Sequence, residues 1–201
     1  MAATARGIVN PALFICDLQE KFRPAIYEYA KVITTTQKML KAAKILNIPV
    51  FATTQQASKL GPTCSELDLD SPGGVATKIH ADKTLFSMIT PDVKSALPSG
   101  KLSCVIVGIE SHICVTQTTL DLLALGHKVY VLADGVSSCN REEVPIALAR
   151  LRGEGAVVTT SESFIFEAMG DAGISEFKDI AGVVKEFKEG TKGVLGSLCK
   201  F

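Results

Sequence analysis

One cysteine in this chain of 201 residues stands where nucleophilic chemistry is favoured. Cys114 follows an apolar run, residues 104–108, that predicts a buried strand, and the chain from about His112 predicts the start of a helix. At a helix N-terminus, unpaired backbone N–H groups and the positive end of the helix dipole favour thiolate over thiol. The alternative is a small core residue, as most free cysteines are. Whether Cys114 is a nucleophile or a core residue therefore depends on the polar residues that lie near it.

Two further residue types could activate this cysteine. Asp17 directly follows another apolar strand, and the carboxyl ends of parallel strands meet at one edge of a sheet, so Asp17 and Cys114 should share a rim. A carboxylate can accept the thiol proton, and an ammonium group stabilises both anions. Lys78 and Lys83 are the candidates for that ammonium. Taken singly, Asp17 is more typical of a turn or helix cap, and either lysine of a surface charge.

Short apolar segments alternate with segments of helical spacing. The predicted strands are residues 12–16, 50–53, 104–108, 129–133 and 156–159, and the predicted helices are residues 31–46, 113–125, 142–152, 161–169 and 174–187. Mostly continuous apolar strands are typical of a parallel sheet covered on both faces. The pattern predicts an α/β fold, a three-layer sandwich around a mainly parallel, doubly wound sheet.

Composition narrows the classes of partner. Lys and Arg number 21, equal to Asp and Glu at 21, so no charge excess favours nucleic acid or an anionic membrane. No apolar run approaches the ~18 residues that a membrane span needs, and the N-terminus lacks a signal-peptide pattern. The six cysteines form no C-x-x-C pair and no zinc spacing with histidine. A reduced, cytoplasmic setting fits these features.

Several short motifs follow one another in a specific order. They are residues 14–22, 60–63, 83–88 and 108–114, and residues 119–123 also fit. With these motifs, the chain resembles the isochorismatase-like cysteine hydrolase superfamily over about residues 11–180. The resemblance implies a catalytic triad of Asp17, Lys83 and Cys114, with Lys83 preferred over Lys78 because it immediately precedes Thr-Leu-Phe-Ser-Met. It also implies a cis peptide at Ile109–Glu110 and an oxyanion hole that uses the backbone N–H groups of Glu110 and Cys114.

Departures from the family pattern limit the reaction. Nicotinamidases of this superfamily carry an Asp-x-His metal motif after the second strand, where this chain has residues 53–56, Thr-Thr-Gln-Gln. We therefore expect no metal and no other cofactor, and nicotinamide becomes a weaker candidate substrate. Isochorismatases that cleave a vinyl ether typically lack the cysteine, so Cys114 disfavours that reaction too.

The resemblance also suggests a division of the chain. Residues 1–10 would be an N-terminal extension, residues 11–187 the isochorismatase-like hydrolase domain, and residues 188–201 a flexible or docking tail, since glycines interrupt its periodicity. The longest irregular stretch, residues 55–74, follows the second strand, where long loops are usually functional or disordered. Candidate pocket residues lie in or beside the rim motifs: Gln19, Phe22, Gln55, Gln56, Phe86 and His112. Cys16 and Cys139 are more typical of core or loop residues than of redox partners.

The sequence thus predicts a cysteine-dependent hydrolase of a small amide or other C–N substrate, acting through a thioester. Two alternatives stay open: a non-catalytic protein that uses this fold for binding or oligomeric contacts, and a thiol protein that forms sulfenic acid at Cys114. A small molecule and further copies of the chain, in a homo-oligomer, are the expected partners.

Overall fold

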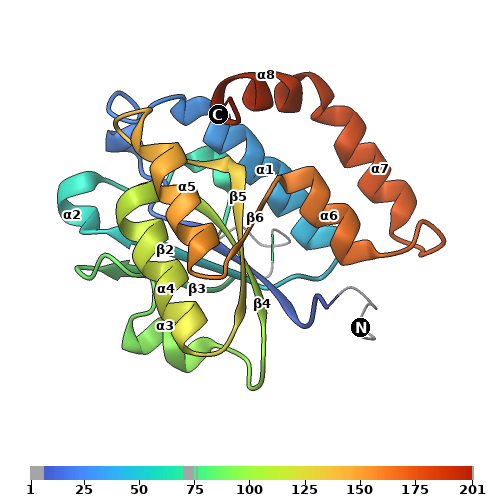
Figure 1. Cartoon of the computed structure of the whole chain (residues 1–201), viewed down its shortest axis with the longest axis horizontal. Coiled ribbons are helices and arrows are strands. Elements are labelled where there is room, and N and C mark those ends of the chain that lie inside the picture. The colour runs from blue at the N-terminus through green and yellow to red at the C-terminus, as the bar shows by residue number, and fades with distance from the viewer. Residues whose placement is uncertain (1–6, 70–74, 76, 201) are drawn as a thin grey trace.

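The computed structural model describes residues 7–69, 75 and 77–200. Its centre is a parallel sheet with helices on either side (Figure 1). The sheet has six strands in the order β3-β2-β1-β4-β5-β6. The strands are β1 (Pro11–Cys16), β2 (Val50–Gln55), β3 (Thr77–Lys83), β4 (Ser103–Ile109), β5 (Lys128–Ser137) and β6 (Val157–Thr159). This is the α/β, doubly wound arrangement that the alternation of strands and helices predicts.

Helices connect the strands and cover both faces of the sheet. They are α1 (Tyr29–Ile45), α2 (Ala57–Leu60), α3 (Pro91–Ala96), α4 (Thr116–Ala124), α5 (Glu143–Gly153), α6 (Ser161–Met169), α7 (Phe177–Glu186) and α8 (Lys188–Leu198). The described residues also form two 3-10 turns, η1 (Glu20–Phe22) and η2 (Ser65–Leu67), and one π-helical turn, η3 (Ser111–Val115). No helix within the described residues is long and apolar enough to cross a membrane.

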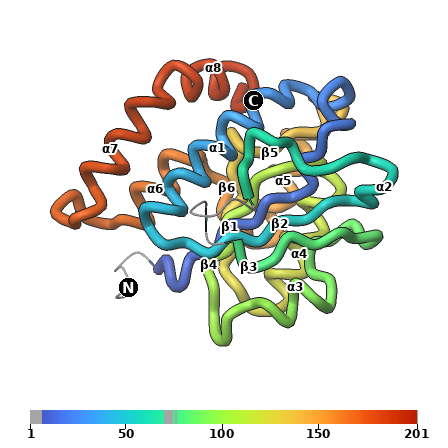
Figure 2. Tube along the Cα trace, turned by 180° about the vertical axis from the view of Figure 1, so that it is seen from behind, coloured from blue at the N-terminus to red at the C-terminus, as the bar shows by residue number. Residues whose placement is uncertain are grey.

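Alternate residues of each central strand enter different apolar cores. Leu13 and Ile15 of β1 pack on the face covered by α1 and α6–α8, whereas Phe14 and Cys16 pack on the face covered by α3–α5. Because successive side chains of a strand point to opposite faces, a strand buried on both sides must be apolar throughout. The result is a three-layer sandwich. The rear view in Figure 2 shows α7 and α8 lying beside α1 on one face of the sheet.

Two segments differ from the sequence-based expectation. Residues 77–83 form the edge strand β3, which the apolar pattern misses because its side chains are mostly only partly buried. Residues 188–198 form α8, which packs against α1 through the buried side chains of Val194 and Leu198; of the two alternatives for the tail, flexible or docking, this part takes the docking one, as a helix that the glycines did not predict. Of the expected 55–74 loop, residues 57–60 and 65–67 are short helical turns, and residues 70–74 lie outside the described part.

The strand order reverses between β1 and β4, which are neighbours in the sheet although α1, β2 and β3 separate them in sequence. In open α/β sheets, ligands bind beyond the carboxyl ends of the strands at such a reversal. Cys16, the last residue of β1, lies opposite Gly108 of β4. Gly108 has φ +120°, and a Cβ there would lie 2.1 Å from the carbonyl oxygen of Cys16. Only glycine therefore lets the two strands meet at this point.

Candidate active site

Asp17 lies at the carboxyl end of β1 and is almost fully buried. Its φ of +51° takes the chain out of strand geometry immediately after Cys16. The carboxylate has a defined set of donors: Thr53 Oγ1 at 2.8 Å from Oδ1, and the ammonium group of Lys83 at 2.7 Å from Oδ2. A buried carboxylate needs such partners, because an isolated charge in the interior is very costly.

Lys83 ends β3, two strands away from Asp17, and its side chain reaches past the end of β2. Besides Asp17, its ammonium group contacts Oε1 of Gln55 at 2.7 Å and the backbone carbonyl oxygens of Leu85 and Phe86 at 3.0 Å each. Its side chain is 0% exposed. Lys78, the other lysine considered, is exposed. The structure therefore joins Asp17 and Lys83 in a buried ion pair.

Two glutamines fix the strand ends around this ion pair. Gln19 exchanges hydrogen bonds with the backbone of Gln55: its Oε1 accepts from the N–H at 2.7 Å, and its Nε2 donates to the carbonyl at 3.2 Å. The same Nε2 donates to the carbonyl of Gly61 at 2.7 Å. The Gln55 side chain donates to the carbonyl of Thr84 at 3.0 Å. Gln19 and Gln55 thus position Lys83 through neighbouring backbone and side-chain contacts.

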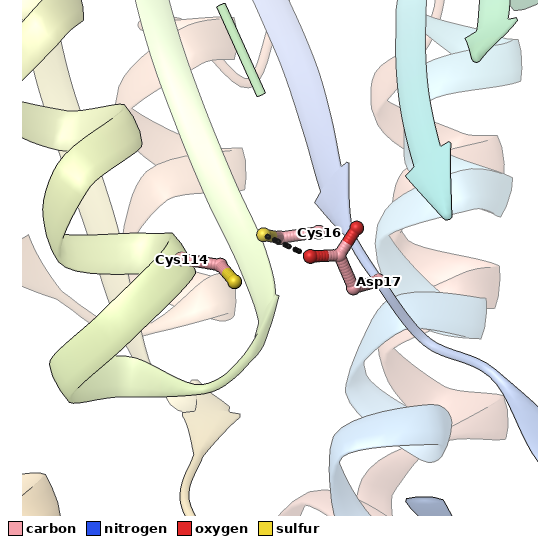
Figure 3. Close-up of side chains that lie close together, drawn as sticks. All are labelled: Cys16, Asp17 and Cys114. Atoms are coloured by element: carbon pink, nitrogen blue, oxygen red, sulfur yellow. Dashed lines mark hydrogen bonds between the residues drawn. The ribbon is translucent and has the colours of Figure 1, made fainter. Parts of the chain in front are cut away.

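Cys114 lies in η3, the π-helical turn between β4 and α4, and its side chain belongs to the apolar core on the α3–α5 face. Its sulfur, the sulfur of Cys16 and a carboxylate oxygen of Asp17 all lie within 4.8 Å of one another. Figure 3 shows the three side chains converging from β1 and from the helical turn after β4. The reversal in strand order thus brings together residues nearly 100 positions apart, as the shared rim predicts.

Cys16 is the member of this cluster that the sequence interpretation misses. Its thiol lies 3.7 Å from Oδ2 of Asp17 and can donate to it. Burial, together with the neighbouring Cys114 and Asp17, raises the pKa of the Cys16 thiol well above its ordinary value. One signal was present in the sequence: Cys16 precedes Asp17 directly and therefore ends on the rim. Its apolar neighbours made a core role more typical.

The segment between β4 and Cys114 contains the candidate oxyanion residues. The peptide bond between Ile109 and Glu110 is cis, as the resemblance implies. The carbonyl of Glu110 accepts from the N–H groups of Ile113 and Val115, and its carboxylate accepts from the N–H of Cys139 at 2.7 Å. A side-chain hydrogen bond with Glu110 is the main cause that raises the pKa of the Cys139 thiol.

The remaining candidate pocket residues occupy different settings. His112 is half-buried, and its Nδ1 lies 3.0 Å from the hydroxyl of Ser138. Phe22 packs against the core on the α1 face, and Gln56 donates its N–H to the carbonyl of Lys83 at 3.0 Å. Phe86 is 52% exposed beside the equally exposed Leu85. The structure thus ties Gln19, Gln55 and Gln56 to the Lys83 strand end and leaves Phe86 at the surface.

Among the residues that the structure describes, three groups of side chains have donors spaced closely enough to hold a metal ion: Cys16–Asp17–Cys114, Glu110–His112–Cys139 and Glu20–Cys64–Glu66. In the first group, the ammonium group of Lys83 already neutralises Asp17. In the third, Arg23 forms ion pairs with both glutamates, at 2.5 and 2.6 Å. These cations occupy the positions beside the carboxylates, which weakens the case for a metal cation in either group.

Comparison with known proteins places this geometry in a family. The model of the isochorismatase domain matches residues 11–163. The chain is 44% identical over 180 residues to the secreted isochorismatase effector Isc1 of Phytophthora sojae, covering 88% of this chain and 85% of the relative. It is 40% identical over 179 residues to isochorismatase domain-containing protein 2 of Homo sapiens, covering 88% and 84%. The structure of the MAR1 ribonuclease of Caenorhabditis elegans superposes with a TM-score of 0.83 at 37% identity, covering 92% of each chain. The chain therefore belongs to the isochorismatase domain family.

Proposed function

We propose that this protein is a cysteine-dependent hydrolase of a small amide or a related C–N substrate, with Asp17, Lys83 and Cys114 as its catalytic triad. One observation carries the proposal. A buried carboxylate, held by a buried ammonium group at 2.7 Å, lies within 4.8 Å of a cysteine sulfur at the carboxyl edge of the sheet. A nucleophile beside a base that a third group orients is the general arrangement for covalent catalysis.

The proposed reaction has two halves. Asp17 accepts the proton of Cys114, and the thiolate attacks the carbonyl carbon of the substrate. The backbone N–H groups of Glu110 and Cys114 stabilise the negative oxygen that develops. The C–N bond breaks, the amine or ammonia leaves with the proton from Asp17, and a thioester remains on Cys114. Water then hydrolyses the thioester to release the acid and restore the thiol.

Lys83 has a positioning and electrostatic role in this scheme. Its ammonium group holds the Asp17 carboxylate and, through two carbonyl contacts, the backbone at Leu85 and Phe86. These two side chains are 53% and 52% exposed directly after the catalytic strand end. We propose that they contact an apolar part of the substrate, because exposed large apolar side chains beside a site commonly mark a binding surface.

An alternative function follows from the C. elegans relative, which is named a ribonuclease. RNA binding depends strongly on phosphate contacts from Lys and Arg, and this chain has equal numbers of acidic and basic residues. The charge balance favours a small neutral or weakly charged substrate. A non-catalytic binding role remains the other alternative, and both are outcomes of the experiment below.

We further propose that the protein works in a reducing compartment such as the cytoplasm and forms a homo-oligomer. All six cysteines are free thiols, which supports a reducing setting. The side chain of Ile146 on α5, which is 66% exposed, supports self-association. Light scattering after gel filtration measures the mass of the assembly, and a monomer at all concentrations would contradict this part.

The function is tested with a panel of small amides, scored by release of ammonia or amine. Wild-type protein should turn over at least one member, and Cys114→Ala should abolish turnover. Cys104→Ser, which changes another buried cysteine, on β4, should retain turnover.

Acid quenching during turnover, followed by mass spectrometry, should show an acyl adduct on Cys114. Turnover that persists in Cys114→Ala would contradict the mechanism. Cleavage of RNA without amide turnover would favour the ribonuclease alternative, and inactivity on both classes would favour a binding role.

A further inference from the structure

Two thiols, rather than one, lie at the centre of the proposed site. The sulfur atoms of Cys16 and Cys114 are within 4.8 Å of each other, and both side chains belong to the apolar core on the α3–α5 face. Figure 3 shows them extending toward each other from β1 and from the turn after β4. The proposed hydrolysis uses only the sulfur of Cys114. The second thiol therefore has no part in the reaction as derived.

We propose that Cys16 and Cys114 are a modification site, in which a peroxide converts the two thiols into a reversible intramolecular disulfide that inactivates the protein. The inference rests on the proposed function only for the nucleophilic reactivity of Cys114. A disulfide requires the sulfurs at about 2.05 Å, so they must approach by at most about 3 Å.

Exposure and burial decide which sulfur the oxidant attacks. Cys114 is 8% exposed, whereas Cys16 is 0% exposed on β1. Thiolates react with peroxides far faster than thiols do. Cys16 is fully buried, and this burial is the main cause that disfavours its thiolate. Cys114 is therefore the site of first oxidation, and Cys16 is the neighbour that resolves it.

The chemistry balances in two steps. Asp17 accepts the proton of Cys114, and the thiolate attacks one oxygen of the peroxide. The O–O bond breaks, a sulfenic acid forms on Cys114, and the leaving hydroxide takes the proton back from Asp17 and departs as water. Asp17 then accepts the proton of the Cys16 thiol, which lies 3.7 Å from its Oδ2. The Cys16 sulfur attacks the Cys114 sulfur, the S–O bond breaks, and hydroxide leaves with the proton from Asp17 as water. Two thiols are oxidised by two electrons, and one peroxide is reduced to two waters.

The other cysteines have surroundings that do not offer this route. Cys64 contacts the hydroxyl of Tyr29 at 3.3 Å, and burial raises the pKa of Cys104 to about 12. Cys139 is exposed beside Glu110, and burial raises the pKa of the Cys199 thiol to about 11. Of the three groups of closely spaced Cys, His and acidic side chains within the described residues, only the group with Cys16 and Cys114 contains two sulfurs. A disulfide there consumes the nucleophile and prevents further oxidation to sulfinic acid.

The test uses full-length Cys104→Ser protein, because trypsin leaves Cys104 and Cys114 in one peptide, residues 102–128, and Cys16 in another, residues 7–21. The protein is treated with graded hydrogen peroxide, its free thiols are blocked with iodoacetamide, and the digest is analysed by mass spectrometry without reduction. We expect a cross-linked pair of these two peptides that a thiol reductant separates. Reductant should also restore Cys114 alkylation. Cys16→Ser/Cys104→Ser should lose the cross-link and accumulate sulfinic acid at Cys114.

Four results would overturn the inference, and the last of them would also remove the proposed function. One is sulfinic acid at Cys114 accumulating equally with and without Cys16, and another is a cross-link from Cys114 to a different cysteine. The third is an alkylation rate of Cys114 that depends on Asp17 while no cross-link forms. That result would contradict the disulfide and leave the proposed hydrolase function standing. Cys114 that neither alkylates nor oxidises would remove both proposals. The cross-link in the Cys104→Ser protein is decisive even if Cys16→Ser folds poorly.

Discussion

The ammonium nitrogen of Lys83 lies 2.7 Å from Oδ2 of Asp17, and the two side chains are only 0% and 2% exposed. Breaking a buried ion pair by removing one partner typically costs about 3–5 kcal/mol, because the other charge stays buried without compensation. Lys83→Met should therefore lower the free energy of unfolding by about that amount, measured by urea denaturation. Asp17→Asn combined with Lys83→Met should be less destabilised than the sum of the single variants.

The surface pair of Lys41 and Glu186 gives the matched control for this ion pair. Its side chains are 50% and 54% exposed, although the charged atoms are as close as 2.5 Å. Exposed pairs contribute only about 0–1 kcal/mol. Lys41→Met should therefore change the stability little. Equal losses in Lys41→Met and Lys83→Met would contradict the importance of burial at the site.

Gly108 allows β4 to approach β1 beside the site. At φ +120°, an added Cβ would lie 2.1 Å from the carbonyl oxygen of Cys16. Gly108→Ala should therefore destabilise the fold by about 3 kcal/mol or more, through both strain and the clash. Gly182→Ala, in α7 with no atom within 4 Å of its added Cβ, should instead stabilise by about 0.5–1 kcal/mol. Thermal and urea unfolding of both variants check the contrast.

The sequence predicts the fold and the closeness of Asp17 and Cys114. Continuous apolar segments indicate parallel strands, and the carboxyl ends of parallel strands lie at one edge of the sheet, where both residues follow a strand. Lys83 is different, because it stands on the edge strand β3, whose polar sequence gives no strand signal. Only the resemblance to a known family distinguished Lys83 from the exposed Lys78.

Other features depend on tertiary contacts that periodicity does not reveal. α8 contains three glycines, which are poor helix formers, and it is held by the burial of Val194 and Leu198 against the core on the α1 face. The role of Gln19 depends on the backbone of Gln55, 36 residues later. Cys16 shares the apolar character of its strand, so its closeness to Cys114 follows from the register of β1 and β4 rather than from its own sequence context.

Ser111 has the one buried side-chain oxygen or nitrogen, within the described part of the chain, that lacks a hydrogen-bond partner. A buried hydroxyl without a partner loses its hydrogen bonds to water on folding and gains none in the protein, so removing it should not lower the stability. Ser111→Ala should therefore leave stability unchanged or raise it by up to about 1 kcal/mol. Thr118 is the control, because its hydroxyl accepts from the N–H of Met88 and donates to the carbonyl of Cys114. Thr118→Val should lose about 1–3 kcal/mol. A large loss in Ser111→Ala would reveal a partner for its hydroxyl.

Glu110 contacts an exposed cysteine, Cys139, next to the site. Its side-chain hydrogen bond raises the pKa of the Cys139 thiol, so less thiolate is present at a given pH. Glu110→Gln should lower that pKa, and Cys139 should alkylate faster at pH ~8.5, the ordinary pKa of a thiol. Cys199, whose pKa is raised to about 11 chiefly by burial, should be unaffected. Peptide mass spectrometry measures both rates, and an unchanged Cys139 rate would contradict the assignment.

The central claim is that Asp17 and Lys83 activate Cys114, and the rate of Cys114 alkylation by iodoacetamide at neutral pH tests it most directly. The rate is read from the peptide of residues 102–128 in the Cys104→Ser background, beside Asp17→Asn and Lys83→Met in the same background. The mechanism predicts that Cys114 reacts first among the remaining cysteines and that Asp17→Asn slows it by about 100-fold or more, the range of one general base. A Cys114 that reacts no faster than Cys139 and is indifferent to both substitutions would contradict the triad.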